Sequence, residues 1–146
     1  MNGGAYEANM EGNWKFQLRV IVSAQLGSML RGDPSCAAHV ALHDVLRRHR
    51  ASALCQYDVF AEYVDEAERL GPEQYPLYEW TRDSIGNPEK KPKYLETFVV
   101  YVEDEAVYEG RIADPLEAEL AELVDHDEIR SISRVDTNPA NYAGKR

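Results

Sequence analysis

The sequence predicts a single α+β domain, in which a four- to five-stranded mixed or antiparallel sheet carries helices on one face. The chain has 146 residues, the length of one ordinary domain. Its composition, 44% hydrophobic and 29% charged, is that of a globular protein that folds around an apolar core. Apolar residues recur with a period of two in some segments and with helical spacing in others, which predicts both strands and helices.

The first half of the chain is predicted to fold as strand, helix, helix and strand. Residues 15–22 alternate polar and apolar side chains, the pattern of a half-buried strand. Ser23 is placed to cap a short helix that a Gly-Asp-Pro turn ends. Ser35 is placed to cap a second helix that runs to about Arg50 and has a basic last turn. The run over residues 54–59 predicts the next strand.

The middle of the chain is predicted to be helical. Residues 60–70 carry apolar side chains at helical spacing and stop at a Gly-Pro pair, which breaks helices. A further short helix is expected over residues 75–84. Residues 86–93 hold two prolines, a glycine and three lysines, so we expect a loop there.

The last third is predicted to add a hairpin, a helix and a final strand. The apolar, β-branched run at residues 95–102 and the shorter run at 106–109 predict a hairpin with an acidic turn. Asp114 followed by Pro115 combines an N-cap acid with a proline at the first helical position. Residues 129–135 predict the last strand.

The order of these elements resembles the split βαβ pattern of ferredoxin-like domains, provided that the middle helices are an insertion. Segments 1–13 and 137–146 lack an apolar period, so we expect a flexible arm and a flexible tail around a domain at residues 14–136. The predicted core consists of Phe16, Leu18, Val20, Leu42, Val45, Leu46, Val100, Leu116, Leu120 and Leu123.

The charge of the chain is large and unevenly distributed. The net charge is −10, and residues 96–128 alone carry twelve acids against one arginine. An anionic field of that size repels nucleic acids and anionic membranes and attracts cationic partners. We therefore expect a cationic protein surface as the partner, with no direct binding to nucleic acid and no membrane association.

The chain shows no signature of an enzyme. It has no nucleophile elbow of the Gly-x-Ser-x-Gly type and no Gly-x-x-x-x-Gly-Lys phosphate loop. Its only cysteines, Cys36 and Cys55, form no Cys-x-x-Cys pair and no disulfide framework, which favours a reduced, cytoplasmic protein. We therefore expect a protein without catalytic residues and without a cofactor.

One set of side chains has the spacing of a metal site. Cys36, His39 and His43 would share one face of the predicted helix. Arg47 and Arg50 continue that face, and their charges oppose a bound cation. An ordinary solvated helix face explains the spacing better, so no metal is expected.

The acidic hairpin and helix carry the main functional hypothesis. A compact anionic surface can imitate nucleic-acid phosphates and occupy the basic groove of a nucleic-acid-binding protein, so we expect a non-catalytic binding or inhibitor protein that blocks a cationic partner. Small accessory proteins of phages and mobile elements share this size and acidity. The competing explanation is a solvated face that only maintains solubility. The candidate partner-binding residues are Glu103, Asp104, Glu105, Glu109, Glu117, Glu119, Glu122 and Asp125.

The alternative hypothesis is a protein that binds and sequesters a small molecule or nucleotide, in a monomer or a homodimer. Tyrosine and tryptophan side chains can stack on a ring, and clustered bases can hold phosphate. The same aromatic residues can equally well fasten an irregular segment to the core. The candidate ligand-binding residues are Tyr75, Tyr78 and Trp80 with Arg47 and Arg50, or with the cluster of Lys90, Lys91 and Lys93.

Overall fold

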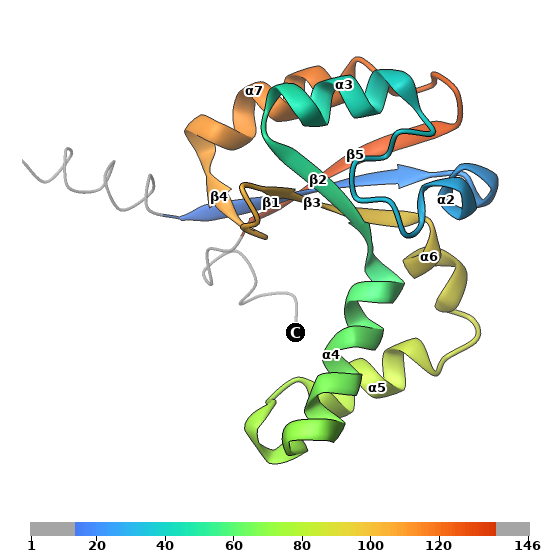
Figure 1. Cartoon of the computed structure of the whole chain (residues 1–146), viewed down its shortest axis with the longest axis vertical. Coiled ribbons are helices and arrows are strands. Elements are labelled where there is room, and N and C mark those ends of the chain that lie inside the picture. Colours follow the sequence, from blue (N-terminus) through green and yellow to red (C-terminus); the bar gives the residue numbers. More distant parts are fainter. Residues whose placement is uncertain (1–13, 137–146) are drawn as a thin grey trace, which may run out of the picture.

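A five-stranded antiparallel sheet organises the chain, which a computed structural model describes over residues 14–136 (Figure 1). The predicted arm at 1–13 and tail at 137–146 lie outside the described residues. The elements are β1 (Lys15–Val22), α2 (Ala24–Leu30), α3 (Val40–Arg48), β2 (Ala51–Cys55), α4 (Gln56–Leu70), the 3-10 helix η1 (Pro72–Gln74), α5 (Tyr78–Ile85), α6 (Lys91–Leu95), β3 (Thr97–Val102), β4 (Tyr108–Glu109), α7 (Gly110–Ala121) and β5 (Ile129–Asp136).

The strand order is that of two interleaved split βαβ units. The four long strands are ordered β2, β3, β1 and β5, and every neighbouring pair is antiparallel. Strands β1 and β2 are connected through α3 with β3 between them, and β3 and β5 are connected through α7 with β1 between them. The predicted ferredoxin-like arrangement is therefore confirmed, and the helical insertion is α4 to α6, between β2 and β3.

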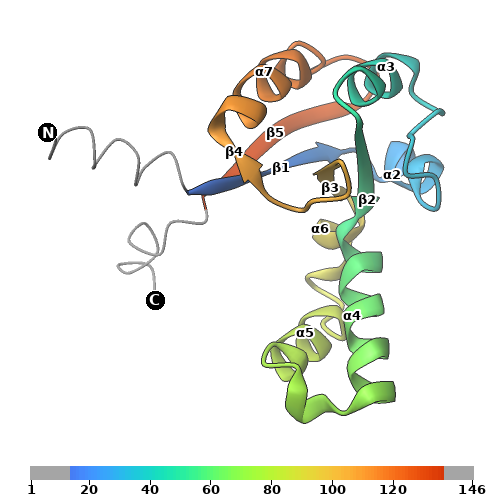
Figure 2. The same ribbon diagram turned by 60° about the vertical axis from the view of Figure 1, so that its left-hand side comes forward.

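Helices α3 and α7 lie side by side over one face of the sheet (Figures 1 and 2). The alternation predicted for β1 is confirmed, because Leu18, Val20 and Val22 are fully buried in the core. Eight of the ten predicted core residues are buried, and Phe16 and Leu123 pack against the core partly buried. The described residues therefore form one domain around a single core.

Strand β4 pairs with β1 and not with β3, so only the acidic turn of the predicted hairpin forms. There Val102 and Glu105 exchange backbone hydrogen bonds of 3.0 and 2.9 Å in an isolated antiparallel bridge. Phe16 of β1 faces Tyr108 of β4, just beyond the point where Leu18 faces Val100 of β3. The Tyr108 side chain is buried, and its hydroxyl accepts a hydrogen bond from Leu18 N (3.0 Å) and donates one to Val100 O (2.8 Å). Burial of this ring beside β1 explains the pairing, which sequence alternation could not show.

Helix α3 begins at Val40, five residues after the predicted cap at Ser35. Cys36 has a φ of 55°, in the left-handed region that a right-handed helix cannot include. The Asp33 carboxylate accepts two backbone N–H groups of this stretch, so it closes a turn where the helix was expected. His39 caps the helix instead, and its Nδ1 accepts a bond from a first-turn N–H at 3.1 Å.

Three other boundaries differ from the prediction. The strand expected at 54–59 ends at Cys55, because the residues that follow belong to the helical period of α4. The loop expected over residues 86–93 runs into the short helix α6. Helix α7 begins at Gly110, so Pro115 lies inside it, where a proline removes one intrahelical hydrogen bond.

Helices α4, η1 and α5, which we call the helical arm, extend away from the sheet on the side opposite α3 and α7 (Figure 2). Aromatic rings hold the arm together. The Phe60 ring contacts Trp80 and Tyr94 edge-on at centroid distances of 5.8 and 5.1 Å, and Tyr63 contacts Tyr75 at 5.4 Å. The apolar faces of these helices thus pack against each other and against α6.

Candidate functional site

The eight candidate partner-binding carboxylates lie between the end of β3 and the residues that follow α7. Three lie in the turn between β3 and β4, one precedes α7, three lie on or at the end of the helix, and one follows it. Helix α7 has 12 residues and is therefore about 18 Å long. The eight carboxylates therefore come from four consecutive segments: the turn after β3, β4, α7 and the residues after α7.

Half of these carboxylates are ion-paired within the molecule. The pairs are Glu103–Arg50 (3.5 Å), Glu109–Arg111 (2.7 Å), Glu117–Arg134 (2.7 Å) and Glu119–Arg48 (2.6 Å). Glu119 also lies 2.8 Å from His49, and its hydrogen bonds to Arg48 and His49 lower the pKa of Glu119 below its ordinary value. The other four, Asp104, Glu105, Glu122 and Asp125, are exposed and have no ion-pair partner among residues 14–136.

The aromatic residues of the alternative hypothesis pack the helical arm. The Tyr75 hydroxyl donates a hydrogen bond to Glu66 (2.6 Å), which raises the pKa of Tyr75, and the Tyr78 hydroxyl donates one to Glu68 (2.9 Å). Trp80 contacts Phe60 with one edge but is 54% exposed. The two tyrosine hydroxyls are thus bound to carboxylates, and Arg82 Cζ lies 5.3 Å from the centre of the Tyr78 ring.

The arginines of the same hypothesis lie elsewhere. Arg47 lies in the last turn of α3 and Arg50 just after this helix, which is on the opposite side of the sheet from the helical arm (Figures 1 and 2). Arg50 pairs with Glu103, and Arg47 lies 3.9 Å from Asp44. The structure therefore does not bring these arginines together with Tyr75, Tyr78 and Trp80.

The Cys36, His39 and His43 set does not converge on one point. Burial raises the pKa of the Cys36 thiol to about 12, so this group is not a thiolate at neutral pH. Because Nδ1 of His39 accepts a hydrogen bond from the backbone, Nε2 carries the proton and is not a metal ligand. His43 directs Nδ1 to the Ser35 carbonyl oxygen at 2.8 Å. Nowhere in the described part of the chain do three metal-ligating side chains cluster.

Replacing His39 tests its role as the cap of α3. His39 Nε2 is buried and has no hydrogen-bond partner among residues 14–136, while Nδ1 caps α3. Asparagine keeps a capping oxygen, so His39→Asn is expected to lower the free energy of unfolding less than His39→Ala, which loses the cap and about 1 kcal/mol or more. Urea unfolding measures both. Equal losses in the two variants would show that the cap at this position contributes nothing to stability.

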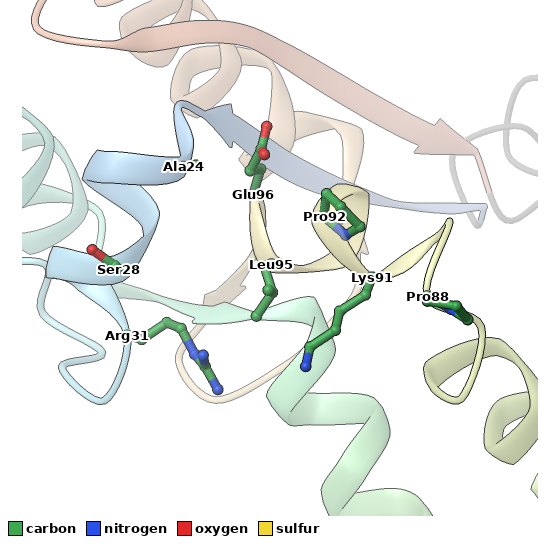
Figure 3. Close-up of a pocket in the computed structure, with 8 residues that line it drawn as sticks. All are labelled: Ala24, Ser28, Arg31, Pro88, Lys91, Pro92, Leu95 and Glu96. Carbon is green, nitrogen blue, oxygen red and sulfur yellow. The ribbon is translucent and has the colours of Figure 1, made fainter.

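Between α2 and α6 the structure forms a pocket that sequence analysis missed (Figure 3). Its volume is about 260 Å³. Gly27 of α2 allows this approach, because a Cβ at that position would lie only 3.0 Å from the carbonyl oxygen of Leu95. The pocket is lined by Ala24, Ser28, Arg31, Pro88, Lys91, Pro92, Leu95 and Glu96.

Two cations lie at the mouth of this pocket and share one aromatic ring. Lys91 Nζ lies 5.4 Å and Arg31 Cζ 5.9 Å from the centre of the Tyr57 ring. Arg31 also donates two hydrogen bonds to Asp58, at 2.6 and 3.0 Å. Glu96 points away from both cations (Figure 3) and pairs with an arginine of β5 at 2.9 Å. Lys91 belongs to the lysine cluster that the alternative hypothesis predicted to hold a phosphate. No sequence pattern connects Lys91 with Arg31.

Comparison with known proteins gives no relative of this chain. No family model, no curated protein and no solved structure matches it. Among residues 14–136, no helix has both the length and the apolar character needed to cross a bilayer. The function is therefore inferred from the charged and apolar surfaces of residues 14–136.

Proposed function

We propose that the protein is a non-catalytic binding protein that blocks a cationic surface of a partner, with a nucleic-acid-binding protein as the favoured partner class. The supporting observation is the set of four exposed carboxylates without internal partners: Asp104, Glu105, Glu122 and Asp125. Carboxylates left unpaired along a helix keep their charge available to attract and orient cationic groups of a partner. The four ion-paired carboxylates contribute less, because their charge is already compensated.

The helical arm is a second acidic surface, on the side of the sheet opposite α7. Residues 56–85 contain eight acids against Arg69 and Arg82. Three of the large apolar side chains that are exposed in the described residues also belong to it: Leu70 (56%), Leu77 (58%) and Trp80 (54%). Protein interfaces combine apolar anchors with a polar rim, and tryptophan is enriched among the residues that dominate binding energy.

A charge variant restricted to the unpaired carboxylates tests this proposal. Asp104 and Asp125 have φ values of 68° and 72°, which asparagine tolerates better than lysine, so the variant combines Asp104→Asn, Asp125→Asn, Glu105→Lys and Glu122→Lys. A partner is captured from lysate with the parent protein, identified, purified and titrated by calorimetry. We expect the variant to bind it about tenfold or more weakly, and the parent complex to weaken with salt, because exposed charges are screened.

A matched control variant changes the net charge by the same amount at residues away from α7. Glu62→Gln, Glu73→Gln, Glu79→Lys and Glu89→Lys change the charge by the same amount on the helical arm and the loop after it. We expect this control to weaken the complex less than the α7 variant does. Equal weakening would mean that α7 has no larger share in binding than the helical arm or net charge has, and a complex that resists both salt and the α7 variant would contradict the proposal.

A further inference from the structure

We propose that the pocket between α2 and α6 binds a small amphiphilic anion, that is, a compact apolar body carrying one carboxylate or phosphate group. The pocket shares no residue with the carboxylates on which the proposed partner binding depends. It is therefore a separate site, and its occupancy can be tested independently.

The walls of the pocket suit the apolar part of such a ligand. The lining is mostly apolar, Ala24, Pro88, Pro92 and Leu95 are four of its eight residues, and the prolines have fixed backbone φ. The volume is about 260 Å³, and cavities of about 150 Å³ already hold benzene. A single ring with a short polar substituent therefore fits.

The mouth of the pocket suits an anionic group. In Figure 3 the ends of Arg31 and Lys91 lie on the same side of the pocket, with Leu95 between them. Two of the five Arg31 donors bind Asp58, which leaves three donors for a ligand. No carboxylate of the described chain lies within ion-pair distance of Lys91 Nζ. Because Asp58 compensates Arg31, the uncompensated charge at the mouth is that of Lys91, which an anion would neutralise.

The two cations are also held in place before a ligand arrives. Both lie over the Tyr57 ring, and this contact is attractive for Lys91 and Arg31 alike. The Asp58 hydrogen bonds further restrict Arg31. Side chains that are already ordered lose less conformational entropy on binding, and charge-assisted hydrogen bonds are about twice as strong as neutral ones.

The test uses the full chain, labelled with ¹⁵N, and five small probes followed by NMR titration. Benzoate and phenyl phosphate carry both an apolar ring and an anionic group. Benzyl alcohol lacks the charge, benzylamine reverses it, and inorganic phosphate lacks the ring. We expect saturable shifts in α2 and α6 with benzoate or phenyl phosphate, and binding about tenfold or more weaker for the other three. Comparing the two anionic probes distinguishes carboxylate from phosphate.

Two variants and a control locate the binding. Lys91→Gln is expected to weaken the anionic probes about tenfold, whereas Lys93→Gln, on the same helix but outside the pocket, should leave the affinity unchanged. Ala24→Phe fills the pocket from an exposed position and is expected to abolish the shifts. Circular dichroism verifies that each variant is folded.

Three results would overturn the proposal. The first is the absence of saturable binding of either anionic probe to the parent protein. The second is binding that a folded Ala24→Phe variant retains, which would place the ligand elsewhere. The third is equal affinity for benzyl alcohol and benzoate, because the mouth would then not select an anion.

Discussion

Leu120→Ala is expected to lower the free energy of unfolding by about 2–5 kcal/mol, because the variant removes buried methyl groups and leaves a cavity. Leu120 is fully buried on the face of α7 that covers the sheet. Helix α3 lies beside α7, so the surrounding side chains cannot collapse freely into the space. Urea unfolding followed by circular dichroism measures the change.

Leu123→Ala provides the control for this result. Leu123 lies just beyond the end of α7 and is only partly buried against the core. The same chemical change there should cost less, about 1 kcal/mol, because less apolar surface returns to water. A loss below about 0.5 kcal/mol for Leu120→Ala would mean that α7 does not pack on the sheet through this face.

Tyr108→Phe is expected to lower the free energy of unfolding by about 2 kcal/mol or more. The hydroxyl of Tyr108 bridges Leu18 N and Val100 O, two facing backbone groups of β1 and β3. Removing it leaves a buried donor and a buried acceptor unsatisfied, at a cost of about 1–3 kcal/mol for each. Tyr101→Phe is the control, because Tyr101 is only half-buried and its hydroxyl has no hydrogen-bond partner among residues 14–136.

The same variant should change the alkaline limb of the stability profile. Burial raises the pKa of Tyr108 from its ordinary value of 10.0 to about 12. The unfolded chain therefore releases this proton at lower pH than the folded chain, so stability falls as the pH rises between these two values. Tyr108→Phe should remove that part of the loss. An unchanged alkaline limb, together with a loss equal to that of Tyr101→Phe, would contradict the bridging role.

Local patterns predicted those elements whose stabilising contacts are themselves local. The alternation in residues 15–22 predicted β1, and Ser23 caps α2 as expected, with its hydroxyl accepting a bond from a first-turn N–H at 3.1 Å. Ser35 failed as a cap because Asp33 competes for the same stretch of backbone. The partner of β4 could not be predicted, since it depends on where the Tyr108 ring becomes buried.

The candidate sites show the same difference between local contacts, which the sequence predicts, and tertiary contacts, which it does not. The sequence identified the carboxylates of α7 but not their internal partners, because Arg48 belongs to α3 and Arg134 to β5. At the pocket between α2 and α6, Lys91 and Arg31 are sixty positions apart in the sequence. They meet only because α2 packs on α6. Contacts of this kind depend on tertiary packing, which residue spacing alone does not encode.

The central position of β1 has a consequence for synthesis of the chain. Strand β1 is made first, but its neighbours β3 and β5 begin only at Thr97 and Ile129. At about 5–20 residues per second, a ribosome needs roughly 5–20 s to pass from the end of β1 to the start of β5. During that time one edge of β1 has no partner. Unpaired strand edges of different chains pair with each other, which leads to aggregation. A transcript truncated before Ile129 would make this exposure permanent, so its product should aggregate or be degraded.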